Sequence, residues 1–218
     1  METIYRNVNS IDWITAVILG SFFLLVLGKH FYKSLFFNFI ILPFNNKYIG
    51  FNNKKGKLFN WFHIILSLFQ LLNFSLFIYL IKGVFFSENI GSIPIFFFIA
   101  LGLLIFYLLI KIAIQMLNAF VFDANDLISG LILSKISYFN YSSLVAFLAN
   151  IILTYILQSS KIVIFVSIFC IFLINSIGIV NLLRNYQKLI SINLLYFILY
   201  LCALEIAPVV IIGSFVKD

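Results

Sequence analysis

The feature that most constrains this chain is a series of long apolar runs separated by short polar segments. The run from residue 95 to residue 122 contains a single charged residue, Lys111, and exceeds the about 20 residues that a helix needs to cross hydrocarbon. Hydrophobic residues make up 64% of the 218 residues and charged residues only 10%, whereas soluble domains are about half apolar and a quarter charged. The chain is therefore predicted to be an integral membrane protein.

The apolar runs predict an all-α fold, a polytopic membrane helix bundle with six transmembrane helices and one or two interfacial helices. The segments between the runs are too short to bury a core of their own, so residues 1–218 are predicted to form one membrane domain. The predicted spans are residues 13–30, 61–80, 95–122, 140–157, 162–183 and 189–215.

The first run could instead be a secretory signal peptide. Its apolar stretch is long, however, and Lys29, His30 and Lys33 close it where a small-residue cleavage site would be expected. A permanent membrane anchor is therefore predicted.

Two segments between the spans are predicted to lie on the membrane surface. Residues 31–60 mix aromatic and basic side chains, which predicts an interfacial helix before Pro43 and a polar loop after it. Residues 123–139 mix acidic, basic and apolar residues and are predicted to form a second interfacial helix. The loop carries the largest basic cluster, which is expected to bind anionic head groups: Lys47, Lys54, Lys55 and Lys57.

The net charge of +7 raises the alternative of a nucleic-acid partner. Basic and aromatic residues do interleave in residues 31–60, but the aromatic side chains are needed at the lipid boundary. No nucleic-acid binding is therefore expected, and the positive charge is interpreted as charge at the membrane surface.

The basic residues also orient the bundle. If the first loop faces the cytoplasm, ten of the fourteen basic residues lie on that side, and the positive-inside rule then places both termini on the opposite, outer side. The ten residues are Lys29, Lys33, Lys47, Lys54, Lys55, Lys57, Lys111, Lys135, Arg184 and Lys188.

Glu205 is the only acidic residue that falls well inside an apolar run. An ionised carboxylate near the centre of a bilayer costs about 3 kcal/mol or more, so such a residue tends to face protein or a wet cavity. Pro208 has no N–H, and it therefore leaves the carbonyl of Leu204 without its helical partner, which predicts a kink. Either Glu205 is a neutral group that hydrogen-bonds across helices, or it belongs to a proton or ligand site.

Three asparagines are predicted to share the depth of Glu205 in the membrane. Asn73, Asn150 and Asn175 each lie within about two helical turns of the middle of their spans. Such a belt of polar residues forms either interhelical hydrogen bonds, worth about 0.6 kcal/mol each, or the lining of a small aqueous cavity that ends at Glu205.

A polar stripe marks the second half of the third span. Lys111, Gln115 and Asn118 follow one another at spacings of four and three residues, which places them on one helix face. The stripe is either a packing seam or the exposed end of a protruding helix. Lys111 is expected to extend its ammonium group toward the head groups and not to pair with Glu205.

Metal and catalytic sites are not indicated. His30 and His63 stand alone, without Cys, Asp or Glu at ligand spacing, so no metal or cofactor is predicted. Asp123 and Asp126 could hold Mg²⁺ for a reaction on lipid phosphate, although such a pair after a helix is more often a cap and a solvated turn. The absence of a Gly-rich phosphate loop, an HExxH motif or a Ser/His/Asp set disfavours an enzyme.

Three sequence features carry a resemblance to a known family. Residues 200–208 read Tyr-Leu-Cys-Ala-Leu-Glu-Ile-Ala-Pro, Asp12 and Trp13 open the first span, and a basic aromatic segment follows it. Over nearly its whole length the chain resembles a family of multi-pass inner-membrane proteins of Bacteroidota that is catalogued as a domain of unknown function. The resemblance implies a Bacteroidota inner membrane and no established activity. In such a membrane the orientation given by the basic residues places both termini in the periplasm.

Two functions remain open. A lineage-restricted membrane protein without catalytic motifs suggests, by analogy, a subunit that scaffolds an envelope complex such as the type 9 secretion or gliding machinery. The alternative is a proton-linked small-solute carrier or channel that uses Glu205. The first is favoured because Glu205 has no second ionisable group at matching depth, whereas proton relays use chains of them.

Overall fold

The structure, a computed structural model, describes residues 12–43, 61–86, 94–121, 125–158 and 160–192. These residues form helices and a few turns at helix ends, with no strand among them. The elements are α1 (Asp12–Phe31), α2 (Lys33–Ile40), α4 (Trp61–Phe86), α5 (Ile95–Val121), α6 (Asn125–Ile151), the π-helical turn η1 (Ile152–Ile156) and α7 (Lys161–Ile192).

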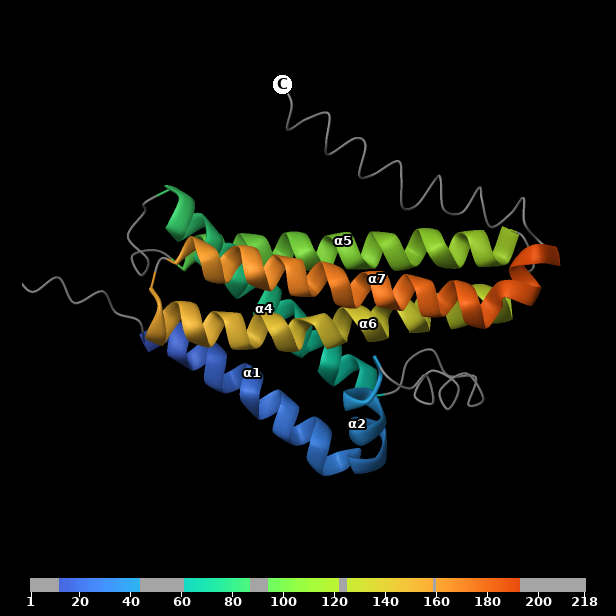
Figure 1. Cartoon of the computed structure of the whole chain (residues 1–218), viewed down its shortest axis with the longest axis horizontal. Helices are drawn as coiled ribbons and strands as arrows, with labels where there is room; N and C mark the ends of the chain where they lie inside the picture. Colours follow the sequence, from blue (N-terminus) through green and yellow to red (C-terminus); the bar gives the residue numbers. More distant parts are fainter. Residues whose placement is uncertain (1–11, 44–60, 87–93, 122–124, 159, 193–218) are drawn as a thin grey trace, which may run out of the picture.

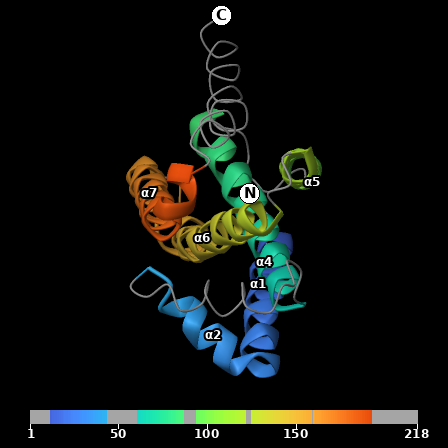
Figure 2. The same cartoon turned by 90° about the vertical axis from the view of Figure 1, so that its right-hand side faces the viewer.

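Helix α6 lies in the middle of the bundle (Figures 1 and 2). It packs against α7 on one side and against α4 on the other, and α4 crosses it obliquely. Helix α1 packs along α4, and the short helix α2 follows at its end. Helix α5 contacts α4 and α6 and lies at the edge of the bundle when it is viewed along the helices (Figure 2). Helices α4 and α6 are therefore the centre around which the other helices pack.

Within the described residues, five helices are long and apolar enough to cross a membrane. The candidate spans are Asp12–Phe31, Trp61–Phe85, Ile95–Leu117, Gly130–Ile156 and Lys161–Leu182. The sixth predicted span, residues 189–215, lies outside the described residues except for the last turn of α7.

Apolar side chains form two buried clusters. The first joins α1, α4, η1 and α7 around Ile14, Leu76, Leu153 and Ile164. The second joins the end of α2 to α4 and α6. Its members are Phe39, Leu42, Phe62, Leu66 and Tyr138. The segment around α2 is thus held against the bundle by buried apolar contacts; a position on the lipid head groups remains a prediction.

The structure contradicts the separate helix predicted for residues 123–139. From Asn125 onward these residues belong to α6, which continues without a break to Ile151. The sequence pattern misleads because charged residues and Gly130 interrupt the apolar residues of this segment. Its Ser134 and Ser137 are nevertheless buried, and they donate hydrogen bonds to carbonyls four residues back in the same helix. Serines whose hydroxyls are satisfied in this way can lie inside a bundle. The fourth membrane helix therefore begins earlier than residue 140.

The predicted break between residues 183 and 189 is also wrong. Helix α7 continues through Arg184 and Lys188 and ends at Ile192. The two basic residues are typical of the end of a span, but a helix can extend beyond the hydrocarbon while cationic side chains reach the head groups. Helix α4 likewise extends beyond the predicted residue 80, to Phe86.

Candidate functional site

Asn73 and Asn150 join the two central helices. The Asn150 side-chain nitrogen, Nδ2, donates a hydrogen bond to the backbone oxygen of Asn73 over 3.0 Å, and neither residue is exposed by more than 1%. Asn73 in turn donates from Nδ2 to the backbone oxygen of Phe69 over 2.8 Å. A polar contact between α4 and α6 is therefore enclosed in the middle of the bundle.

Several buried amide atoms on the two central helices have no partner among the described residues. They are Oδ1 of Asn73, Oδ1 of Asn150, and both side-chain polar atoms of Asn140. Buried polar atoms normally have a hydrogen-bond partner, because leaving one unsatisfied costs about 1–3 kcal/mol. The centre of the bundle therefore offers acceptor oxygens to a water molecule or to a donating side chain.

A change of helix geometry follows directly after Asn150. In η1 the Leu157 amide donates to the oxygen of Ile152, five residues back, over 2.8 Å. The Thr154 hydroxyl donates to the oxygen of Asn150 over 2.7 Å. Single turns of π-helix occur often at functional sites, and here the turn adjoins the polar contact between α4 and α6.

Asn175 does not take part in this contact among the described residues. Its Nδ2 donates to the oxygen of Ile171 in its own helix over 2.8 Å. It lines a cavity of about 260 Å³ between α5, α6 and α7, together with Tyr107, Lys111, Gln115 and Lys135. The structure thus brings two of the three predicted asparagines together and places the third at a different site.

The polar stripe of the third span faces this cavity. Gln115 is 3% exposed and lines it together with Lys111, so this part of the stripe is a packing seam and not an exposed helix end. The side chain of Asn118 lies outside the described side chains.

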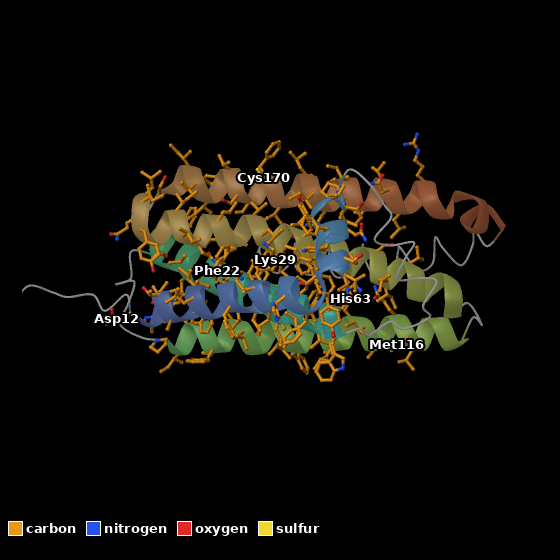
Figure 3. All side chains as sticks on the ribbon, turned by 90° about the horizontal axis from the view of Figure 1, so that it is seen from below. Asp12, Phe22, Lys29, His63, Met116 and Cys170 are labelled. Atoms are coloured by element: carbon orange, nitrogen blue, oxygen red, sulfur yellow. The ribbon has the colours of Figure 1, made fainter. Side chains whose placement is uncertain are left out.

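A second cavity, of about 240 Å³, lies between α4, α5 and α6. Its polar lining comes from α4, where His63, Ser67 and Gln70 lie on one helix face, and its remaining wall is apolar. His63 and Gln70 are buried, and Figure 3 shows His63 within the bundle. The described residues contain no group of three or more His, Cys, Asp and Glu side chains that could hold a metal ion.

Tyr138 connects three elements at the junction of α2, α6 and α7. Its hydroxyl accepts a hydrogen bond from Asn181 Nδ2 over 2.9 Å and donates to the oxygen of Leu42 over 3.4 Å. Gly178 faces its ring so closely that a Cβ atom there would lie 2.6 Å from Tyr138 Cγ. The sequence did not predict this junction, although Gly178 inside an apolar run is a signal of close helix packing.

Other predicted site residues cannot be placed. Glu205, Pro208 and the basic loop of Lys47, Lys54, Lys55 and Lys57 lie outside the described residues, as does Asp123.

The fold and the buried polar contacts define a class of protein, a multi-pass helical membrane protein. The family described as Domain of unknown function (DUF4271) matches residues 14–216, and the chain belongs to it. No curated protein matches the chain, and no solved structure matches it.

Proposed function

We propose that this protein is a non-enzymatic subunit of the bacterial inner membrane that scaffolds or stabilises a larger envelope complex in Bacteroidota. The type 9 secretion and gliding machineries are the examples that we favour. The observation that carries the proposal is the large apolar surface of α5 and α7. In the most apolar part of each helix only 11% and 17% of the residues are buried.

Both helices carry rows of large exposed side chains. On α7, Phe165, Phe169 and Phe172 follow at spacings of four and three residues and are each more than 60% exposed. On α5, Ile99, Leu103 and Phe106 follow at the same spacings and are each more than 50% exposed. The outward side chains of α5 and α7 are visible along the two edges of Figure 3. Such surfaces contact either lipid or the helices of a partner.

The test is purification of the native protein from a gentle detergent, followed by mass spectrometry of the proteins that stay bound. We expect a constant set of membrane partners. Two variants locate the contact: Phe165, Phe169 and Phe172 all changed to Ala, and Ile99, Leu103 and Phe106 all changed to Ala. At least one variant should lose the partners while it keeps the helical content of the unmodified protein. A homo-oligomer without partners would contradict the proposal.

The alternative is a proton-linked carrier or channel that uses Glu205. The oxygens Oδ1 of Asn73 and Oδ1 of Asn150 are buried and have no partner among the described residues, which favours it, because buried acceptors of this kind can line the small aqueous cavity that a carrier needs. The change Glu205→Gln distinguishes the two functions, because Gln keeps size and hydrogen bonding but cannot lose a proton. A scaffold should tolerate it. A variant that assembles normally but has lost its function would favour the carrier.

The proposed orientation places both termini in the periplasm and the basic loop in the cytoplasm. A cysteine placed beside Lys55 should then react only with reagents that reach the cytoplasm, and tags at either terminus should be accessible from the periplasm. A cytoplasmic amino terminus would overturn the orientation. Reversing the charges of Lys54, Lys55 and Lys57 should disturb insertion, because these residues are proposed to bind anionic lipid.

A further inference from the structure

The cavity between α5, α6 and α7 is lined by two lysines from different helices. Lys111 comes from α5 and Lys135 from α6, and Gln115 and Asn175 add two amide groups to the same lining. The Lys111 ammonium nitrogen lies 5.6 Å from the centre of the Tyr107 ring. None of the described residues that line the cavity is acidic. Two like charges beside one cavity create a positive potential that attracts anions.

Both lysines lie at the depth where hydrocarbon gives way to head groups. A crossing of about 20 residues that starts at Ile95 is complete near residue 115, close to Lys111. Counted back from Ile156, a crossing of about 20 residues in α6 and η1 begins near residue 137, close to Lys135. Only residues 122–124 separate the end of α5 from the start of α6 in the chain, so the two lysines lie on the same side of the membrane.

The cavity can be reached from the lipid. Tyr107 and Ile179 line it and are 48% and 45% exposed, so the wall continues into the surface that faces the acyl chains. The other lining residues from α5 and α6 include several aliphatic side chains, such as Ile112 and Ile136. A volume of about 260 Å³ is below the roughly 300–1,000 Å³ of sites for drug-sized ligands, and it suits a head group better than a whole solute.

We infer that this cavity binds the phosphate head group of an anionic phospholipid. Lys111 and Lys135 supply the positive charge, and the second N–H of the Asn175 amide, whose first N–H donates to Ile171, supplies a hydrogen-bond donor. The acyl chains lie along the apolar surface beside Tyr107 and Ile179. Basic pockets between transmembrane helices at the level of the head groups are sites of this kind. The site differs from the basic loop of residues 47–57, because it is formed inside the helix bundle.

The test is a titration of the full-length protein in detergent micelles with phosphatidylglycerol and with phosphatidylcholine, followed by native mass spectrometry. Each basic residue near an anionic surface raises affinity about fivefold. The variant with Lys111→Gln and Lys135→Gln should therefore lose roughly thirty-fold of its affinity for phosphatidylglycerol, with little change for phosphatidylcholine. If the double variant is not monodisperse, each single variant should lose about fivefold. The double change to Arg should keep the preference, because it keeps both charges.

The matched control changes Lys82 and Lys161 to Gln. These lysines lie at the opposite end of the bundle. The Lys82 ammonium nitrogen is 4.3 Å from the centre of the Phe96 ring, and that of Lys161 is 5.5 Å from the centre of the Phe85 ring. The control changes the net charge by the same amount. We expect the control to keep the preference for phosphatidylglycerol. An equal loss in the control, or no loss in the Lys111 and Lys135 variant, would overturn the inference.

Inorganic phosphate tests the source of the anion. If the ligand is a lipid, millimolar phosphate should not displace phosphatidylglycerol from the unmodified protein. Displacement by phosphate that depends on Lys111 and Lys135 would assign the cavity to a free anion and overturn the lipid assignment.

Discussion

The central helices and the flanking helices of this bundle differ in what they bury. In the most apolar part of each helix, 56% of the residues of α4 and 44% of those of α6 are buried, against 11% in α5 and 17% in α7. The buried polar residues also concentrate in the centre, where α4 contributes His63, Gln70 and Asn73, and α6 contributes Asn140 and Asn150. The flanks present mainly aliphatic and Phe side chains to their surroundings.

This difference reverses the arrangement of a soluble protein. Lipid is as apolar as a leucine side chain, so burying an apolar residue gains little from solvent exclusion, whereas a polar group in lipid lacks a partner. The least apolar of the long helices, α6, therefore takes the central position. Close packing and hydrogen bonds hold the centre together. The outer faces of α5 and α7 can therefore contact a partner protein in place of lipid while the centre stays folded.

The largest expected effect separates a central phenylalanine from a flanking one. Phe69 on α4 is 1% exposed and its ring centre lies 5.7 Å from that of Phe147, whereas Phe172 on α7 is 68% exposed. Phe69→Ala should lower the free energy of unfolding by about 3 kcal/mol, because it leaves a cavity that neighbours cannot fill. Phe172→Ala should lower it by less than about 0.5 kcal/mol, because lipid or detergent fills the space.

The measurement is a titration with sodium dodecyl sulfate in mixed micelles, in which circular dichroism monitors unfolding. A loss at Phe172 as large as that at Phe69 would break the comparison, because it would show that α7 is packed as tightly as the centre.

The next effect tests the contact between α6 and α7. Gly178→Ala would force a Cβ atom against the Tyr138 ring, which hydrogen bonds to Asn181 and Leu42 hold in place. Overpacking of this kind costs about 1–3 kcal/mol. A Cβ atom added to Gly102 on α5 would meet no atom within 4 Å, so Gly102→Ala should be neutral or should stabilise the helix by up to about 1 kcal/mol. Thermal unfolding in detergent measures the stability of both variants. Equal destabilisation by Gly178→Ala and Gly102→Ala would contradict the distinction between centre and flank.

Helix α5 could be predicted from the sequence almost completely, whereas the ends of α4 and α7 and the extent of α6 could not. The prediction for residues 95–122 comes within a residue of α5, because an unbroken apolar run has few interpretations. The sequence pattern divides helix α6 into an interfacial helix and a short span. The charged residues of its first part are typical of a membrane surface, but Ser134 and Ser137 in the same part are buried and their hydroxyls bond to the helix backbone.

The candidate sites show the same limit. Composition and depth select Asn73 and Asn150, which do meet, but depth says nothing about rotation around a helix axis, and Asn175 lies at another cavity. The sequence presents Lys111 as part of a polar stripe on its own helix, with an ammonium group that extends toward the head groups. Its cavity with Lys135 arises from the packing of α5 on α6, which connects residues 24 positions apart and leaves no periodic signal in the sequence.

A smaller effect compares two buried or half-buried asparagines. Asn150→Leu removes the hydrogen bond to Asn73 between the central helices, which should cost about 1 kcal/mol on the scale measured for membrane hydrogen bonds. Asn175→Leu removes a bond within α7 only, so it should change the free energy of unfolding by less than about 0.5 kcal/mol. The titration with sodium dodecyl sulfate resolves this difference. A larger loss at Asn175 would move the polar centre of the bundle from α4 and α6 to α7.

The smallest effect concerns a hydrogen bond at the lipid-facing surface. The Tyr155 hydroxyl donates to Thr15 Oγ1 over 2.8 Å and joins η1 to α1, and Tyr155 is 50% exposed. Tyr155→Phe should cost about 0.3 kcal/mol, half the average of about 0.6 kcal/mol, because a threonine hydroxyl in a helix can bond to a carbonyl of its own helix. A double-mutant cycle with Thr15→Val measures the coupling directly. A coupling free energy larger than the loss caused by Asn150→Leu would mean that lipid does not reach the surface near Tyr155. The division between a polar centre and a lipid-facing flank would then not hold at this end of the bundle.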